Sequence, residues 1–317
     1  IDPYLSYRLI EAGYEVWGNM GIYQRCLANY EEDAIFENSR VKEICVNCHA
    51  TNQGNPEEYI FHQRPKPAGT ILVKDGVVSK LNTDYSEKIK TLVYPSWHSS
   101  GKYIAFSVNK MVQAVHSQHR NRIEVMDLHS DIVILDVQKN ILLTSSLLSS
   151  ADAYETFPCF SSDGKKLYFC SAPAISLPDS FNYVRYHLCS LDVDLEKGTL
   201  GSKIDTVIRV DTLNASISFP KISPSGRFML YTRHAYGNFS IWHRDADLCM
   251  FDLHNQREVD TSILNSEETE SYHSWSSEGH WIVFSSRRMT GLFTCLYLAH
   301  IDSSGHAGKP FLLPQKR

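Results

Sequence analysis

The feature that most constrains the fold is an internal repeat that occurs four times without gaps, at residues 94–107, 157–170, 219–232 and 272–285. Each copy begins with an aromatic residue, and the next residue is usually proline. One variable residue, an apolar residue, a polar turn that contains glycine and an apolar strand then follow in order. The turn glycines are Gly101, Gly164, Gly226 and Gly279. A tight hairpin turn needs positive φ, which glycine adopts without strain. We therefore expect these glycines to occupy equivalent positions in successive units around one axis.

Further strand-like runs follow each hairpin, so that each repeat contains four strands. After the third hairpin, for example, the runs are 247–253 and 257–259. The glycines are spaced by 63, 62 and 53 residues. Four-stranded units at this spacing are typical of a β-propeller. We also expect the residues at the fourth repeat position to be buried between blades: Trp97, Phe160, Ile222 and Trp275.

The predicted fold is an all-β propeller with five recognisable blades and an N-terminal lead-in. A degenerate blade spans 44–90, and the others span about 91–150, 151–215, 216–269 and 270–317. A sixth blade can be assembled from the termini. Residues 1–43 match no blade, and their apolar residues between Tyr4 and Trp17 are loosely helical in spacing. We expect a helical or irregular segment that packs on the propeller or supplies a strand that closes the ring.

Composition excludes several classes of protein. Hydrophobic residues make up 43% and charged residues 21%, which are ordinary globular values. The net charge of −5 excludes a strongly basic nucleic-acid binder. No apolar run reaches the ~18–20 residues that span a bilayer, so no membrane span is predicted. The chain begins at Ile1 without a signal region, which indicates a processed or trimmed product and leaves export untested.

The repeats resemble those of TolB-like periplasmic β-propellers. The resemblance covers residues 94–317, and the degenerate unit extends it to about residue 44. A Cys-x-x-Cys-His insertion is similar to the subset often called cytochrome c biogenesis-like. The resemblance implies a periplasmic or cell-envelope location. It says little about activity, because propellers carry many functions.

The sharpest chemical motif is Cys45-Val-Asn-Cys48-His49. Cys-x-x-Cys-His is the attachment signature of c-type haem, in which two thiols bond the porphyrin and the imidazole ligates the iron. The motif predicts a covalent haem c that transfers electrons or senses redox state. His62, 13 residues downstream of His49, is the nearest candidate for the distal ligand, and His98 is another.

Two other interpretations of the motif remain open. Cys45, Cys48, His49 and His62 are residue types that bind zinc tetrahedrally, although their spacing is poor for known zinc modules. Alternatively, the two cysteines form a disulfide or a free dithiol and no cofactor is bound. The remaining cysteines lie mostly in apolar runs and are predicted to fill the core.

Histidines and arginines near hairpin starts and loops form a second set of candidates. If they converge on the central channel, the histidines could bind a metal or an anion; alternatively, they pack between blades and bond neighbouring backbone. Arginines with one histidine could form a basic rim for a carboxylate or acidic peptide, or they are solvated loop charges. The histidines are His98, His116, His119, His234, His243 and His273, and the rim residues are Arg233, His234, Arg287 and Arg288.

No catalytic residue is predicted. The chain has no serine-hydrolase elbow, phosphate-binding loop or His-Glu-x-x-His motif, and no paired acids stand out in inner strands. The favoured function is therefore a non-enzymatic envelope propeller that binds a protein or peptide partner and carries the haem. The alternative is a haem-free TolB-like scaffold. A third class, an enzyme with its site in the channel, requires convergent acids or histidines. The oligomeric state is left open.

Overall fold

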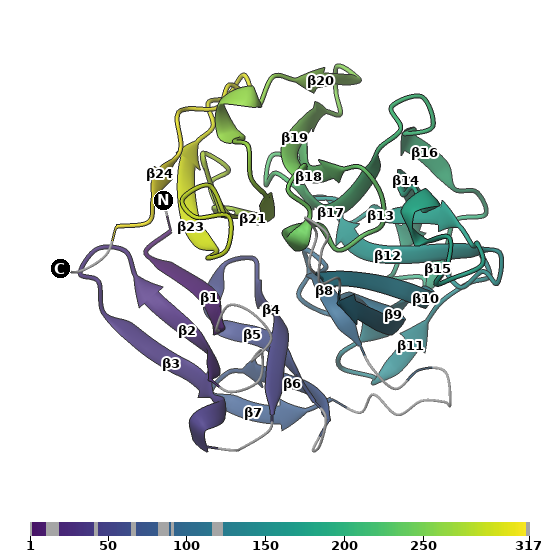
Figure 1. Cartoon of the computed structure of the whole chain (residues 1–317). Helices are drawn as coiled ribbons and strands as arrows, with labels where there is room; N and C mark the ends of the chain where they lie inside the picture. Colours follow the sequence, from purple (N-terminus) through teal and green to yellow (C-terminus); the bar gives the residue numbers. More distant parts are fainter. Residues whose placement is uncertain are drawn as a thin grey trace.

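Nearly all regular structure in the described residues is β-strand, in six antiparallel sheets that surround a central axis as the blades of a propeller (Figure 1). The computed structural model describes residues 2–10, 19–40, 44–64, 68–81, 89, 92–115 and 123–314. The predicted all-β propeller is confirmed, with six blades. None of the helices in these ranges has the length and apolar character needed to cross a membrane.

Blade 1 contains β1 (Tyr4–Ile10), β2 (Met20–Cys26) and β3 (Glu32–Glu37). Blade 2 contains β4 (Cys45–Asn52), β5 (Asn55–Arg64), β6 (Gly69–Lys74) and β7 (Val77–Lys80). Blade 3 contains β8 (Val93–Trp97), β9 (Tyr103–Val115), β10 (Ile123–Asp136) and β11 (Ile141–Leu143). Blade 4 contains β12 (Ala153–Phe160), β13 (Lys166–Pro173), β14 (His187–Asp194), β15 (Thr199–Leu200) and β16 (Asp205–Ile208). Blade 5 contains β17 (Ser216–Ile222), β18 (Phe228–His234), β19 (Asp247–Asp252) and β20 (Arg257–Val259). Blade 6 contains β21 (Glu270–Trp275), β22 (Trp281–Ser286), β23 (Cys295–His300) and β24 (Phe311–Leu312). The described helices are single 3-10 turns: η1 (Asn38–Arg40), η2 (Phe181–Tyr183), η3 (Ser240–Trp242) and η4 (Ser262–Leu264).

Blade 1 corrects the prediction of a helical or irregular lead-in over 1–43. The described part of this segment forms three paired strands, and β1 pairs with β2 along its whole length. The sheet lies between blades 2 and 6 and closes the ring (Figure 1). Asp2 accepts a hydrogen bond from the backbone N–H of Ser277 in blade 6, at 2.8 Å. The loosely helical spacing of the apolar residues was misleading because hydrogen bonds between these strands, and not that spacing, determine the local structure. Tyr14 and Trp17 lie outside the described residues.

The first strands of blades 2 to 6 carry the repeat's opening residue to the axis. These strands contact one another from blade to blade, and each breaks register at the same place. At the bulge the backbone is left-handed, with φ between 47° and 53°. Four aromatic rings meet there, with centroids 4.1 Å apart for Phe157–Phe219 and 4.8 Å apart for Phe219–Tyr272. The bulge residues are Cys48, Tyr94, Phe157, Phe219 and Tyr272.

The hairpin turns behave as the repeat predicts. In each, the glycine N–H donates to the carbonyl three residues earlier, and φ lies between 67° and 74°. The prediction for the fourth repeat position is correct only in part. Phe160 is fully buried, whereas Trp97 and Trp275 are half-buried. Their indole N–H groups donate to the preceding blade, at Ala50 O and Lys221 O.

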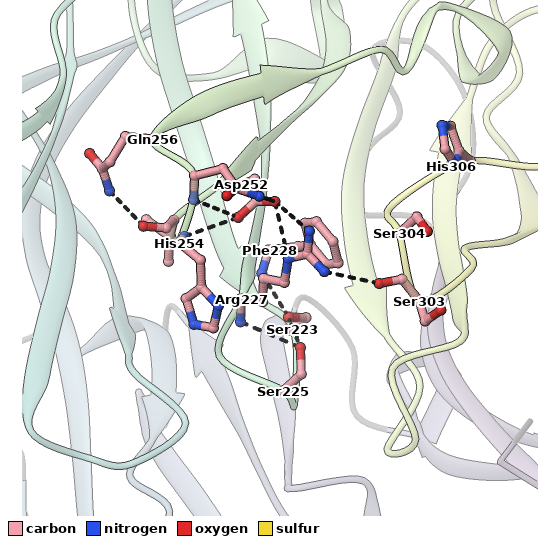
Figure 2. Close-up of polar contacts among 12 residues, drawn as sticks. Ser223, Ser225, Arg227, Phe228, Asp252, His254, Gln256, Ser303, Ser304 and His306 are labelled. Atoms are coloured by element: carbon pink, nitrogen blue, oxygen red, sulfur yellow. Dashed lines mark hydrogen bonds and ion pairs between the residues drawn. The ribbon is translucent and has the colours of Figure 1, made fainter.

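A buried acid joins the outer part of blade 5 to blade 6 (Figure 2). Asp252, at the end of β19, pairs with Arg227 at 2.8 Å and accepts the backbone N–H groups of His254 and Asn255. The same guanidinium donates to the carbonyl of Ser303 in blade 6. The Arg227 hydrogen bonds hold the pKa of Asp252 well below its usual range. This carboxylate is therefore a structural brace between two blades.

Candidate functional site

The candidate site is built by the long hairpin of blade 3. Its strands β9 and β10 contain 13 and 14 residues, whereas the equivalent strands of blades 4 to 6 contain 6 to 8. The hairpin reaches past blade 4 to the loop that follows β18 in blade 5. There Tyr236 donates to Glu124 at 2.8 Å, and Asn238 donates to Asp127. Gly237, with φ of 71°, forms the turn that presents both partners.

A small cavity, here called the hairpin cavity, lies between β10 and the loops of blades 4 and 5. Its volume is about 10 Å³, which is about the room that one water-sized group needs. Its lining combines two carboxyls and one amide with tyrosines and apolar side chains. The lining residues are Glu124, Val125, Met126, Asp127, Tyr154, Leu177, Phe181, Val184, Tyr186, Tyr236, Gly237 and Asn238.

Asp127 is the chemically distinctive group in this cavity. Its side chain is 3% exposed, and its Oδ2 accepts hydrogen bonds from Asn109, at 2.7 Å, and from Asn238. Its Oδ1 is buried and has no hydrogen-bond partner among the described residues. Burial raises the pKa of Asp127 to about 7, against the lowering effect of the two amides. A carboxyl in this state exchanges its proton near neutral pH.

Glu124 stands beside Asp127 with a different set of partners. Its Oε1 accepts from Tyr236, and its Oε2 lies 3.2 Å from Nε2 of His243. The His243 ring packs against Tyr236 and against His234, with centroids 4.7 and 5.1 Å away. His234 is thus the one predicted rim residue that the fold brings to this cluster. Burial lowers its pKa, so that the ring is neutral.

The Cys-x-x-Cys-His motif is a propeller strand. It lies in β4, where Cys48 takes the bulge position that an aromatic residue takes in blades 3 to 6. His49 takes the next position, which is proline in three blades and His273 in blade 6. Cys45 packs in a buried cluster between blades 1 and 2, with Met20, Ile22, Ile44, Val46 and Phe61.

These residues do not fit a covalent haem. Haem attachment requires both thiols and the imidazole to converge on one porphyrin. Here Cys45 packs in an apolar cluster, and Cys48 is beside Tyr94 at the axis. The His49 ring is bonded to the carbonyl of Ser6 in blade 1, at 3.2 Å. We therefore derive no chemistry through a haem.

The zinc interpretation meets the same difficulty. His62 is 1% exposed, and its Nδ1 lies 3.3 Å from the hydroxyl of Thr70 in the next strand. Burial lowers its pKa to about 4. His62 is paired across the sheet with Asn47. Among the described residues, no group of three His, Cys, Asp or Glu side chains could hold a metal ion. All eight cysteines are free.

The other predicted histidines do not converge on the channel. His98 bonds the carbonyl of Gly164 in the next blade, at 3.1 Å, and His273 bonds the carbonyl of Leu230, also at 3.1 Å. These are the blade-packing contacts of the alternative interpretation. His116 and His119 lie outside the described residues.

The predicted arginines also act within the scaffold. Arg233 pairs with Glu258 at 3.0 Å, and Arg288 pairs with the buried Glu270 at 3.1 Å. The Arg287 guanidinium lies 3.7 Å from the ring centre of Trp242, in a cation–π contact. These contacts give each arginine a structural role without bringing the three together.

Sequence reasoning missed Glu124 and Asp127. Their strand was recognised, but their partners Tyr236 and Asn238 lie 112 and 111 residues away along the chain. Only the fold reveals that these acids converge. One signal was available: two acids interrupt the apolar pattern of residues 123–127, in a hairpin longer than those of the other blades.

The comparisons show the fold and no more specific family. No protein-family model matches the chain, and no curated protein matches it. The chain is similar to an oligogalacturonate lyase from Vibrio parahaemolyticus, with a TM-score of 0.53 and 11% identity over 92% of this chain and 71% of that chain. It is also similar to a puromycin-hydrolysing peptidase from Mycobacterium tuberculosis, with a TM-score of 0.52 and 10% identity over 99% of this chain but 45% of that one.

A TolB-like protein from Agrobacterium tumefaciens is also similar, with a TM-score of 0.47 and 14% identity over 76% of this chain and 74% of that chain. A TolB-like propeller is thus among the similar structures, as the repeats predicted. At this TM-score it carries no argument about activity or location. Nothing in the comparisons points to the cytochrome c biogenesis-like subset.

The prediction that the chain is not an enzyme is corrected. It rested on the absence of familiar motifs, and the similar propellers include a lyase and a peptidase. Absence of those motifs is therefore no argument against catalysis on this fold. The paired acids that the sequence did not reveal are also present, in the hairpin cavity.

Proposed function

We propose that this propeller binds a ligand at the hairpin cavity and that Asp127 exchanges a proton with it. The observation that carries the proposal is the buried, unpartnered Oδ1 of Asp127 in the cavity lining. A buried polar atom without a partner is costly, and a ligand that supplies one removes that cost. The cavity admits a water-sized polar head, while the rest of the ligand remains at its mouth.

The protein or peptide partner predicted from the sequence is one source of such a head group. Acid–base catalysis at Asp127 is a second candidate function, favoured by a carboxyl whose pKa is about 7. It predicts that any turnover shows a pH–rate inflection near 7, which Asp127→Asn removes. The envelope location remains a prediction from the resemblance of the repeats.

The proposal is tested by NMR screening of neutral, cationic and anionic fragments against three proteins: wild type, Asp127→Asn and Glu155→Gln. Glu155 is the matched control because it is also a buried carboxyl whose pKa is raised to about 7, yet it does not line the cavity. We expect saturable binding of at least one charge class to wild type and Glu155→Gln, and weaker binding to Asp127→Asn. If no fragment distinguishes Asp127→Asn from wild type, the proposal is wrong and the cavity is structural.

A further inference from the structure

We propose that the hairpin cavity selects a protonated amine: an ammonium head on an apolar body, held by Asp127 within a ring of tyrosines. This inference rests on the proposed function and names the class of ligand. Four features of the site favour an ammonium: the unpartnered oxygen of Asp127, the charges of the lining, its aromatic residues and the size of the cavity.

Asp127 has one oxygen that can accept a further hydrogen bond, and no ion pair with a lysine or arginine is found for it among the described residues. Both amide donors, Asn109 and Asn238, reach the same oxygen, and the buried Oδ1 of this cavity-lining residue has no partner among the described residues. A ligand ammonium supplies both the missing hydrogen bond and the missing charge.

The lining disfavours anions. Two carboxyls, Glu124 and Asp127, face the cavity, and no lysine or arginine is among its lining residues. In a buried site of low dielectric, these carboxyls in their ionised form repel a ligand carboxylate or phosphate. Acidic sugars, such as those implied by the name of the similar lyase, are therefore the wrong charge for this site.

The walls suit a cation with an apolar body. The rings of Tyr154 and Tyr186 lie 6.4 Å apart, and those of Phe181 and Tyr236 lie 5.6 Å apart. The hydroxyls of Tyr154 and Tyr236 already donate hydrogen bonds, to Ile175 O and to Glu124. Their O–H groups are thus engaged within the protein, and the aromatic rings in the lining can attract an ammonium within about 6 Å.

The size of the cavity favours an amine over a sugar. A volume of about 10 Å³ accommodates one water-sized group, and an –NH₃⁺ head has that size. A sugar ring does not fit without displacement of the lining. The apolar side chains Leu177 and Val184 contact the ligand body, whether it belongs to a free amine or to a lysine or N-terminus of a peptide.

The test uses three probes of one shape and different charge: phenethylamine, phenethyl alcohol and phenylacetate. Calorimetry on the full chain should show the amine bound at least ~10-fold more tightly than the alcohol, with no binding of phenylacetate. Asp127→Asn should weaken amine binding ~10-fold or more, and Glu155→Gln should leave it unchanged.

A second readout is the proton released on binding. An ammonium favours the charged form of Asp127, so that up to about half a proton should leave near pH 7. Titrations in two buffers of different ionisation enthalpy measure this release. The other titratable groups of the lining are Glu124 and three tyrosines; burial raises the pKa values of Tyr154 and Tyr186 away from neutrality. Asp127→Asn should abolish the release.

The outcomes separate the two proposals. If the alcohol binds as tightly as the amine and Asp127→Asn weakens both, the amine inference is wrong while the proposed function stands. If Asp127→Asn changes neither, both are wrong, and the cavity holds structural water. Capped lysine peptides that bind where free phenethylamine does not would identify a peptide as the source of the ammonium. If neither source binds at millimolar concentration, the amine inference is overturned.

Discussion

Two buried aspartates of this propeller, Asp252 and Asp127, have opposite surroundings. Asp252 is 1% exposed and is bonded by an arginine, two backbone N–H groups and the amide of Asn255 (Figure 2). Asp127 is 3% exposed and is bonded by two amides at a single oxygen. The pKa of the first lies well below its usual range, and the pKa of the second is raised to about 7. Burial raises the pKa of Asp127, whereas Arg227, a charged partner that Asp127 lacks, keeps the pKa of Asp252 low.

The difference separates a structural acid from a functional one. Both oxygens of Asp252 accept hydrogen bonds, and its partner Arg227 also bonds blade 6, so that Asp252 stabilises the contact between two blades. Asp127 keeps one buried oxygen without a hydrogen-bond partner among the described residues, and it lines a cavity. A buried acid with a raised pKa is not by itself sufficient for a site, however. Glu155 has a raised pKa of about 7 but lies outside the cavity lining, so that geometry must complete the argument.

The largest expected effect is that of Asp252→Ala. The substitution leaves Arg227 and two backbone N–H groups without their acceptor. We expect a loss of about 2–4 kcal/mol in the free energy of unfolding, measured by reversible urea denaturation. The control is Asp192→Ala, which removes an exposed pair with Lys166 and should cost less than ~1 kcal/mol. Equal losses in the two variants would show that the Asp252 network contributes no more than surface charge does.

An effect of opposite sign is expected for Asp127→Asn above neutral pH. The folded-state pKa of about 7 exceeds the unfolded value near 4, so that the folded state binds the proton more tightly. Stability from this group is therefore present below pH ~4 and is lost as the pH rises to about 7. Asparagine has no proton to lose and should exceed wild type in stability above pH ~7, by at most the ~4 kcal/mol that pKa values of about 7 and about 4 imply.

Urea titrations across this pH range measure the effect. The difference between Asp127→Asn and wild type should grow as the pH rises from about 4 to about 7 and then level off. Parallel stability profiles would mean that Asp127 titrates normally, and the comparison with Asp252 would lose its basis.

The sequence was sufficient to predict the propeller because its repeat encodes local geometry. Gly101 and its counterparts mark turns within a few residues of the strands that they join. Blade 1 was expected only as a closing strand or a sixth blade from the termini, because its strands lack the repeat's aromatic residue, proline and glycine. The motif at Cys48 was read as haem chemistry because a three-residue signature cannot show that its bulge occupies an aromatic position at the axis. The site itself depends on contacts over more than a hundred residues, such as Asn238 to Asp127.

The smallest expected effect compares one amide at each aspartate. Asn238→Ala removes a donor that stabilises the charged form of Asp127, so that its pKa should rise above 7 by less than about one unit. Asn255→Ala removes the corresponding donor from Asp252, whose pKa should stay below the usual range because Arg227 remains. Carboxyl-carbon NMR titration measures both groups. Alanine at 238 also enlarges the cavity, and a fall in the pKa of Asp127 would show that entering water outweighs the lost hydrogen bond. That result would contradict the view that the hydrogen bond from Asn238 is what holds the pKa of Asp127 down in the folded protein.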